Sequence, residues 1–173
     1  DLCLMKQQFV KQSSTKSDTL IAYFSCTGNT ETVASYLKEE TDGDIFEIVP
    51  SVPYTADDLN YSNSSCRANQ EQNDPDARPE IAHLPISIEQ YDVIYIGFPI
   101  WWGEEPRIID TFLESFDYSG KIMIPFCTSG SSGITSAVRN IRTMNPDSTV
   151  LDGRRFSSSA SQSQISDFVS EKN

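Results

Sequence analysis

Apolar positions along this chain alternate between short continuous runs and stripes with helical spacing. The runs predict β-strands at 19–25, 44–49, 92–98, 121–127 and 149–156. A run that is apolar at nearly every position, such as 92–98, is typical of a strand covered on both faces. The stripes predict helices after every strand except the second, and consist of Val33, Ala34 and Leu37, of Ile108, Ile109, Phe112, Leu113 and Phe116, of Ile134, Ala137, Val138 and Ile141, and of Ile165, Phe168 and Val169.

The pattern is weaker in two segments. Residues 1–18 are polar and mixed, which predicts a disordered leader before a single domain at 19–173. Residues 50–90 are polar and only weakly periodic. Within them, Thr55 stands three positions before an acidic residue, as at many helix starts. This segment is therefore predicted to hold one exposed helix followed by a loop.

Strands that alternate with helices predict an α/β fold, in which a parallel sheet is covered by helices on both faces. In such sheets, ligands bind beyond the carboxyl ends of the strands. Three loops follow strands at this edge, at 25–30, 99–105 and 127–133. We expect these three loops to form the functional site.

Composition narrows the classes of function. The chain has 173 residues, and its 25 acidic against 13 basic residues give a net charge of −12. This balance argues against unaided binding of nucleic acid and suits a basic protein partner. No apolar run approaches the roughly 20 residues of a membrane helix. The four cysteines form no C-x-x-C pair, and with a single histidine they predict no metal site. Reduced thiols favour the cytoplasm, although the sequence leaves open an export signal that has been removed.

The first loop, SCTGNT, has the composition of an anion site without positive side chains. It leads into a helix, so backbone N–H groups face its ligand. The hydroxyls of Ser25, Thr27 and Thr30 add donors, and Gly28 permits close approach of the backbone. A helix start capped by Asn29 or Thr30 would need no ligand, and that alternative stays open at this point. A phosphatase is disfavoured because no arginine closes the loop. A nucleoside-triphosphate site is disfavoured because the P-loop motif is absent.

The other two loops have different compositions. Loop 99–105 carries both tryptophans, Trp101 and Trp102, and adjacent loop residues cannot both point into the core. At least one ring is therefore expected at the surface as an aromatic wall, unless the pair is simply one core and one rim residue. Loop 127–133 is small, neutral and glycine-rich, which suits close approach to a planar polar ring. Together the three loops fit a phosphate joined by a chain to a flat heteroaromatic ring.

The first predicted strand and its loop form the motif IAYFSCTGNTETVA, in which S-x-T-G-N-T is followed by Ala34. This motif resembles that of the flavodoxin family, specifically its bacterial flavodoxin-like branch with a Trp-Trp loop. The resemblance covers residues 19–170, although Ala22 and Tyr36 depart from the commonest form of the motif. It implies a flavodoxin-like three-layer sandwich, a five-stranded parallel sheet of order 2-1-3-4-5, and FMN as the cofactor.

Carried over position by position, the resemblance assigns residues of all three loops to the cofactor. The FMN phosphate would be held by Ser25, Thr27, Gly28, Asn29 and Thr30. The isoalloxazine would be lined by Pro99, Ile100, Trp101, Trp102 and Gly103. The pyrimidine side of the ring and the ribityl chain would be approached by Thr128, Ser129, Gly130 and Gly133.

The resemblance implies two functions. One is an electron-transfer protein that shuttles electrons between redox partners. Its potential should be low because the three loops contain no Lys or Arg to stabilise a negatively charged reduced flavin. The other is an FMN-dependent NAD(P)H:quinone oxidoreductase, since PIWWGEEP is similar to a loop of flavodoxin-fold quinone reductases. Arg107 is the only basic residue near that loop, so we favour the carrier. Acidic residues there would steer a basic partner: Glu104, Glu105, Asp110, Glu114 and Asp117.

Overall fold

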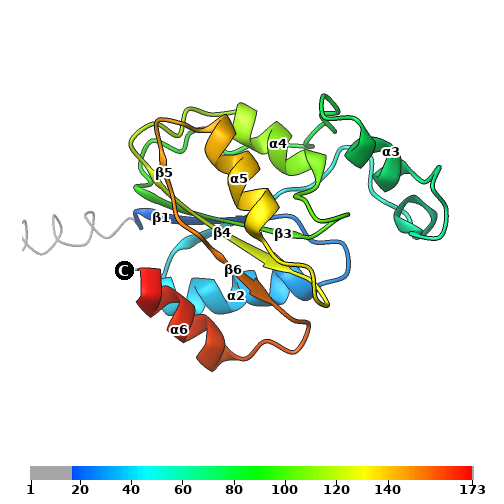
Figure 1. Cartoon of the computed structure of the whole chain (residues 1–173). Helices are drawn as coiled ribbons and strands as arrows, with labels where there is room; N and C mark the ends of the chain where they lie inside the picture. Colours follow the sequence, from blue (N-terminus) through cyan, green and yellow to red (C-terminus); the bar gives the residue numbers. More distant parts are fainter. Residues whose placement is uncertain (1–16, 173) are drawn as a thin grey trace, which may run out of the picture.

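The computed structural model describes residues 17–172 (Figure 1). Most of the expected leader at 1–18 therefore lies outside the described residues, as does Asn173 at the end of the expected domain. Asp18 belongs to the fold, because its carbonyl accepts hydrogen bonds from the backbone N–H groups of Asp92 and Val93, at 2.8 and 3.2 Å. The disorder of the residues before it stays a prediction.

Six strands within residues 17–172 form one parallel sheet. Their order is β2-β1-β3-β4-β5, with β6 paired to β4 beyond the end of β5. The predicted fold class and strand order are confirmed. The strands are β1 (Thr19–Tyr23), β2 (Asp44–Glu47), β3 (Val93–Pro99), β4 (Ile122–Thr128), β5 (Thr149–Val150) and β6 (Arg154–Phe156).

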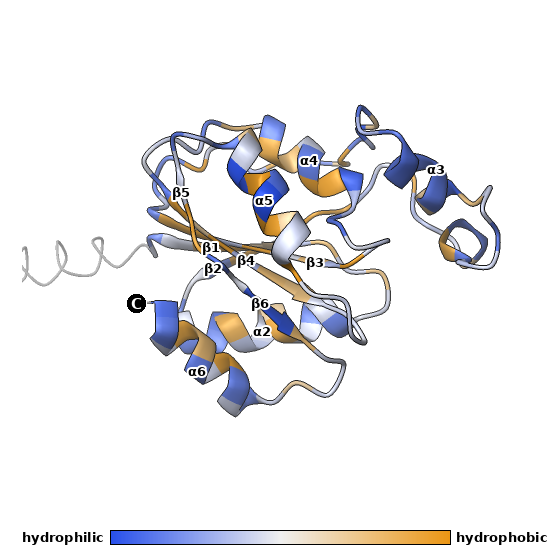
Figure 2. Cartoon of the chain, viewed as in Figure 1, coloured by the Kyte–Doolittle hydropathy of each residue, from blue (hydrophilic) through white to orange (hydrophobic). Residues whose placement is uncertain are grey.

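Helices cover both faces of the sheet and complete a three-layer arrangement. Figure 1 shows α2 and α6 on one face, α4 and α5 on the other, and α3 beyond one edge. Figure 2 shows that α3 is almost entirely hydrophilic, unlike the striped helices on the sheet. The helices are α2 (Asn29–Thr41), α3 (Arg67–Asn73), α4 (Arg107–Glu114), α5 (Thr135–Met144) and α6 (Gln162–Lys172). The four predicted stripes lie on α2, α4, α5 and α6, although Phe116 lies just beyond the end of α4 and Ile134 just before the start of α5.

The core lies on both sides of the sheet. In β3, the side chains of Ile94, Ile96 and Phe98 belong to the cluster under α4 and α5. Tyr95 points the other way, into the cluster under α2 and α6. Because side chains alternate between the two faces of a strand, a strand buried on both faces is apolar at nearly every position.

The prediction of one strand at 149–156 is wrong, because β5 and β6 are separated. The N–H of Leu151 donates to the carbonyl of Met123 at 2.9 Å. Pro125 lies two residues further along β4 and therefore faces the segment that follows β5. Proline has no N–H to continue the ladder. Gly153 lies opposite with a φ of 69°, and a Cβ there would come within 2.2 Å of the Pro125 carbonyl oxygen. The pairing is therefore interrupted at this point.

The predicted helix after Thr55 is also misplaced. Thr55 and Asp58 do form reciprocal capping bonds: the N–H of each donates to the side chain of the other, at 2.8 and 3.2 Å. They cap only the short 3-10 helix η1 (Asp57–Leu59). The α-helix of this segment is α3, which lies in the part expected to be a loop. Its buried residues are only Ala68 and Gln72, so the hydrophobic pattern does not reveal it.

Candidate functional site

The first loop turns the chain from β1 into α2 with its backbone exposed. Gly28 has a φ of 90°, in the left-handed region that favours glycine, and its N–H donates to Ser25 Oγ at 3.2 Å. Gly28 also occupies the N-cap position, where it has no side chain that could cap the helix. The expected alternative of Asn29 or Thr30 as the cap is therefore wrong. The first N–H groups of α2 remain available to an anion.

Thr30 joins the first loop to the third. Its side chain is buried, and its Oγ1 lies 2.7 Å from Oγ1 of Thr128 at the end of β4. Each hydroxyl has one hydrogen and this bond uses only one of the two, so the other hydrogen can serve a second acceptor. Ser25 is half-buried, whereas Thr27 and Asn29 are exposed. The phosphate roles of all these residues stay a prediction.

The second loop folds into a tight hairpin. The N–H of Trp101 donates to the Glu104 carbonyl at 2.9 Å, and the N–H of Glu104 donates back to the Trp101 carbonyl at 3.1 Å. Trp102 and Gly103 between them have φ values of 48° and 82°. Positive φ at both central positions is the pattern of a type I′ turn, which for Trp102 carries backbone strain. The hairpin thus holds the exposed Trp102 outward.

The two tryptophans occupy different environments. Trp101 is buried, and its ring packs edge-on against Phe24 and Tyr54, with centroids 5.5 and 5.2 Å apart. Trp102 is 41% exposed and lies against the ring of Tyr61, at 4.5 Å between centroids. One tryptophan therefore belongs to the core and one to the rim, as one of the two sequence interpretations expected. Whether either contacts a cofactor is a separate question.

A cavity of about 260 Å³ opens between the first two loops. Cys26 and Thr27 form its wall from the first loop, and Pro99, Trp101 and Trp102 form the opposite wall. The volume is slightly below the roughly 300–1,000 Å³ typical of small-molecule sites, as suits a ligand that stays partly exposed. The remaining lining residues come from the segment before β3: Leu59, Tyr61 and Ala68.

These three lining residues were missed by the sequence analysis. The only sequence signal was Tyr61, an aromatic residue in an otherwise polar stretch. Ile100, by contrast, was expected to line the ring but is buried in the cluster under α4 and α5. Its N–H donates to the Thr128 carbonyl at 3.1 Å.

The third loop is open and lies beside the first rather than in the cavity wall. The N–H of Ser129 donates to the Phe156 carbonyl at 3.1 Å, which continues the pairing with β6. Gly130 and Gly133 are exposed, and a Cβ on either would meet nothing within 4 Å. Arg155 reaches this loop from β6, and its Nη1 donates to the Ser129 carbonyl at 3.0 Å. The loops themselves lack basic residues, but the fold places a guanidinium beside one of them.

Cys26 lines the cavity but is poorly suited to act as a nucleophile. Desolvation against the cavity wall raises the pKa of its thiol to about 11, and the charge of Arg67 only partly opposes that rise. The thiolate is therefore scarce at neutral pH. The same conclusion holds for Cys127, where burial raises the pKa to about 12.

The acidic residues expected to steer a partner divide into two groups. Glu105 and Asp110 are buried, with 1% and 3% of their surfaces exposed, so their expected role at the surface is wrong. Glu104 is partly exposed and pairs with Arg107 at 3.4 Å. Glu114 is exposed and pairs with Arg78 at 2.9 Å, and Asp117 is exposed beyond the end of α4. In η1, Asp57 and Asp58 directly precede Leu59, which lines the cavity.

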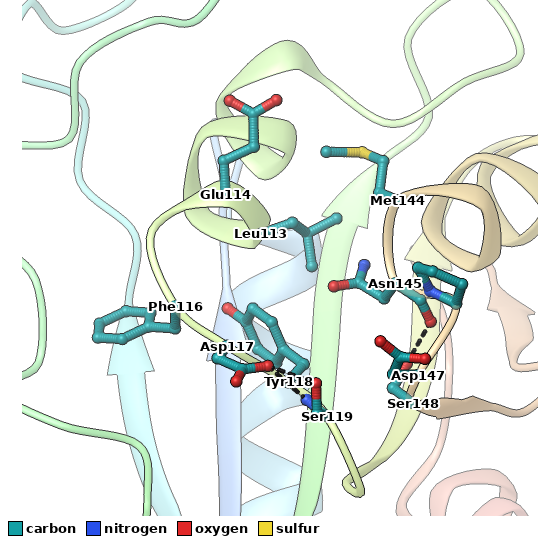
Figure 3. A pocket seen from close by; sticks show the side chains of 11 residues that line it. Leu113, Glu114, Phe116, Asp117, Tyr118, Ser119, Met144, Asn145, Asp147 and Ser148 are labelled. Carbon is teal, nitrogen blue, oxygen red and sulfur yellow. Dashed lines mark hydrogen bonds between the residues drawn. The ribbon is translucent and has the colours of Figure 1, made fainter.

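A second hollow, of about 280 Å³, lies at the opposite end of the sheet (Figure 3). Ser119 and Ser148 line it just before β4 and β5 begin, together with the end of α4. Ligands of parallel sheets bind at the carboxyl ends of the strands, so this hollow is not favoured as the main site. Tyr118 forms its floor and donates its hydroxyl to the Phe112 carbonyl at 3.0 Å.

Residues 17–172 contain neither a cluster of metal ligands nor a helix that could span a membrane. No three His, Cys, Asp or Glu side chains there come together in a metal-binding arrangement. None of the helices in the same range has both the length and the apolar character that a membrane span requires.

Comparison with known proteins identifies relatives over nearly the whole described chain. Residues 18–172 match the protein family described as Flavodoxin. A protein from Bacteroides uniformis ATCC 8492 described as a flavoprotein has a solved structure with a TM-score of 0.86; the match is 42% identical and covers 90% of this chain and 99% of that one. A similar protein from Bacteroides eggerthii DSM 20697 has a solved structure with a TM-score of 0.83; that match is 38% identical and covers 88% of this chain and 96% of the other. None of the curated proteins matches the sequence.

A third structure, a flavoprotein from Lactobacillus acidophilus NCFM in complex with FMN, is more distant. It is 27% identical, with a TM-score of 0.67, and the match covers 87% of this chain and 97% of that one. The strand order, the open N-terminus of α2 and the family match over residues 18–172 agree with one another. This chain belongs to the flavodoxin family.

Proposed function

We propose that this protein binds FMN non-covalently between its three loops and carries electrons between redox partners. One observation carries the cofactor assignment: the open N-terminus of α2 and the tryptophan-lined cavity share the loop at Cys26 and Thr27. A phosphate at the helix end and a flat ring in the cavity can therefore belong to one molecule. The family match and the FMN complex of the Lactobacillus relative support the same cofactor.

The residues present fit this group. The N–H groups of the first loop, with the hydroxyls of Ser25 and Thr27, would bind the phosphate without a full positive charge. Trp102 and Tyr61, whose rings contact each other, would together form one aromatic wall beside the flavin ring, and the open glycines of the third loop would leave room for the ribityl chain. Bound FMN supplies reversible electron transfer. The protein supplies the binding groups and the partial exclusion of water.

A carrier fits the charges better than a nicotinamide-dependent reductase. Among the described residues, the arginines near the cavity are already engaged. Arg67 pairs with Glu71 at 3.0 Å, and Arg155 binds backbone carbonyls of the third loop. The phosphates of a nicotinamide nucleotide would need positive groups that are free. Asp57, Asp58 and Glu104, here called the acidic rim, lie within two residues in the sequence of cavity-lining Leu59 or Trp102, and their charges instead suit a basic protein partner.

The cofactor assignment is tested by titrating the apoprotein with FMN and with riboflavin. Riboflavin leaves the phosphate end empty, so FMN should bind far more tightly. A bond from one neutral donor to the charged phosphate contributes about 1.5–3 kcal/mol, and several such bonds are expected. Equal affinity for the two flavins would exclude the first loop as the phosphate site.

The choice between carrier and reductase is tested by anaerobic stopped-flow mixing with NADPH and NADH, with and without menadione. We expect that neither nucleotide alone bleaches the flavin rapidly. Addition of a reductase protein should bleach it. Rapid bleaching by either nucleotide would instead establish the NAD(P)H:quinone oxidoreductase. We also propose a cytoplasmic location, since Cys26, Cys66 and Cys127 are all free thiols.

A further inference from the structure

Two carboxyl groups are buried together behind the hairpin of the second loop. Glu105 is 1% exposed and Asp110 is 3% exposed. One oxygen of each, Oε1 of Glu105 and Oδ1 of Asp110, is buried without a partner among the described residues. The other two oxygens are paired: Asn140 Nδ2 donates to Glu105 Oε2 at 3.2 Å, and Arg107 Nη1 donates to Asp110 Oδ2 at 3.5 Å. Two ionised carboxylates in this arrangement would be very costly.

A single proton between the two groups removes this cost. The pKa of Glu105 is raised to about 8. Burial is the main cause of this rise, and the neighbouring charge of Asp110 contributes to it. Burial also raises the pKa of Asp110, but the hydrogen bond from Glu105 and the guanidinium groups of Arg78 and Arg107 oppose that rise. A single shared proton would therefore reside on Glu105 and form a hydrogen bond to the Asp110 carboxylate.

The charges around the pair leave no compensation for a second carboxylate. Arg107 of α4 pairs with Asp110 and with Glu104 of the hairpin, at 3.5 and 3.4 Å. Arg78, from the segment before β3, lies 3.9 Å from Asp110 and 2.9 Å from Glu114. On the α5 side, the group that contacts Glu105 is the neutral amide of Asn140. Two guanidinium groups thus already face three carboxylates, before Glu105 is counted.

The same residue anchors the second loop to α3. The Glu105 carbonyl accepts a hydrogen bond from Gln72 Nε2 at 3.1 Å, and the same nitrogen donates to the Trp101 carbonyl at 3.2 Å. The Gln72 side-chain oxygen accepts from the N–H of Arg107 at 3.2 Å. Glu105 therefore lies where the hairpin, α3, α4 and α5 meet. Repulsion between Glu105 and Asp110 would act directly on these contacts.

We propose that Glu105 is a positioning residue, whose carboxylic acid donates a hydrogen bond to Asp110 and so holds the hairpin and α3 in place until the proton is lost. A cavity of about 290 Å³ beside the pair, lined by Asn140 and Thr143 among others, gives the proton a route to solvent. The inference concerns the apoprotein. Only its extension to flavin affinity rests on the proposed function.

The first test measures the unfolding free energy of the apoprotein by denaturant titration from about pH 5 to about pH 9. Folded Glu105 keeps a proton that the unfolded chain, with an ordinary glutamate pKa of about 4.3, has already released. Stability should therefore fall as pH rises between about 4.3 and about 8. Glu105→Gln donates to Asp110 through its amide at every pH, so it should lose this slope. A slope that is the same in Glu105→Gln and the wild type overturns the proposal.

The matched control is Glu104→Gln, which removes the same charge from the adjacent, partly exposed residue. It should keep the slope. Infrared spectroscopy of the wild type adds a readout that needs no variant, in case Glu105→Gln fails to fold. We expect the carbonyl band of a protonated carboxylic acid at neutral pH, and its loss in alkaline solution together with a change in tryptophan fluorescence. Absence of that band at neutral pH overturns the proposal.

The second test measures FMN affinity as a function of pH. If the loop binds flavin only while Glu105 is protonated, the dissociation constant of the wild type should rise about tenfold for each pH unit above the pKa. The ratio of wild type to Glu105→Gln cancels any titration of FMN itself. A flat ratio beside a sloping apoprotein stability would contradict the positioning of the loop. If no variant binds FMN at any pH, the proposed function fails, and the apoprotein measurements still decide the role of Glu105.

Discussion

The two ends of the candidate site are built in different ways. The phosphate end is a single strand–loop–helix unit, in which residues 25–30 present backbone N–H groups beside Gly28. The ring end combines Tyr61 and Ala68, from the segment before β3, with the hairpin at Trp101 and Trp102. One end depends on local backbone geometry. The other depends on how a distant helix docks.

The docking of α3 relies on polar contacts rather than on a hydrophobic face. Gln72 is buried and serves two carbonyls and one N–H of the second loop and α4. Arg107 adds a hydrogen bond from Nη2 to the Gln72 carbonyl at 2.7 Å. Buried polar networks of this kind are costly when one member is lost. Changes far from the cavity should therefore disturb the ring end, whereas only local changes should disturb the phosphate end.

The largest effect is expected from Trp101→Ala. Truncating a buried tryptophan leaves a cavity next to Phe24 and Tyr54, which should lower the unfolding free energy by about 3–5 kcal/mol. The matched variant Trp102→Ala, at the exposed rim, should change stability little but weaken FMN by about 1–3 kcal/mol. Denaturant unfolding and FMN titration separate the two. If Trp102→Ala binds FMN as tightly as the parent, this ring belongs to a partner surface.

The next largest effect is expected from Gln72→Leu. The change introduces an apolar side chain of similar bulk, which leaves the Glu105 carbonyl without its side-chain donor and the N–H of Arg107 without its acceptor, and this should cost about 1–3 kcal/mol of stability. FMN and riboflavin should weaken by the same factor, because only the ring end is disturbed. Gln70→Leu, at an exposed position of the same helix, is the control. A selective loss of FMN over riboflavin would contradict the separation of the two ends.

The same division decides what the sequence could predict. The first loop was predictable because a motif of contiguous residues specifies it. The cavity contribution of Tyr61 and Ala68 was not, because α3 docks through Gln72 and Arg107 and carries almost no apolar stripe. The burial of Glu105 was not predictable for a related reason, because an acidic residue in a loop is expected at the surface unless its partners are known.

The sheet divides in the same way. Continuous apolar runs correctly predicted the central strands, which are covered on both faces, and the resemblance to the flavodoxin family correctly implied their order. The interruption between β5 and β6 was not predicted, since it depends on Pro125 of β4 lying opposite Gly153. Pairing partners of this kind become visible only in three dimensions.

A smaller effect, confined to the phosphate end, is expected from Gly28→Ala. A non-glycine residue in the left-handed region costs roughly 1–2 kcal/mol, and the loop can relieve that strain by moving its N–H groups away from the ligand. Gly120→Ala is a close control: its φ is 76°, a Cβ there also meets nothing within 4 Å, and it lies outside the three loops. Both variants should lose similar stability, but only Gly28→Ala should bind FMN more weakly while its affinity for riboflavin stays unchanged. Equal flavin affinities in the two variants would contradict the assignment of the first loop.

The smallest effect is expected at the acidic rim and should appear in a rate rather than in an affinity for flavin. Asp57→Asn combined with Glu104→Gln removes two charges beside the cavity, so electron transfer to a basic c-type cytochrome should slow by roughly a few-fold at low ionic strength. High salt screens such charges and should abolish the difference. The control pair, Glu89→Gln with Asp147→Asn, removes the same net charge at the other end of the sheet, where both residues are exposed. If the control pair slows the reaction equally in stopped-flow measurements, net charge and not the rim guides the partner, and the ring end would then have no demonstrated role in recognition.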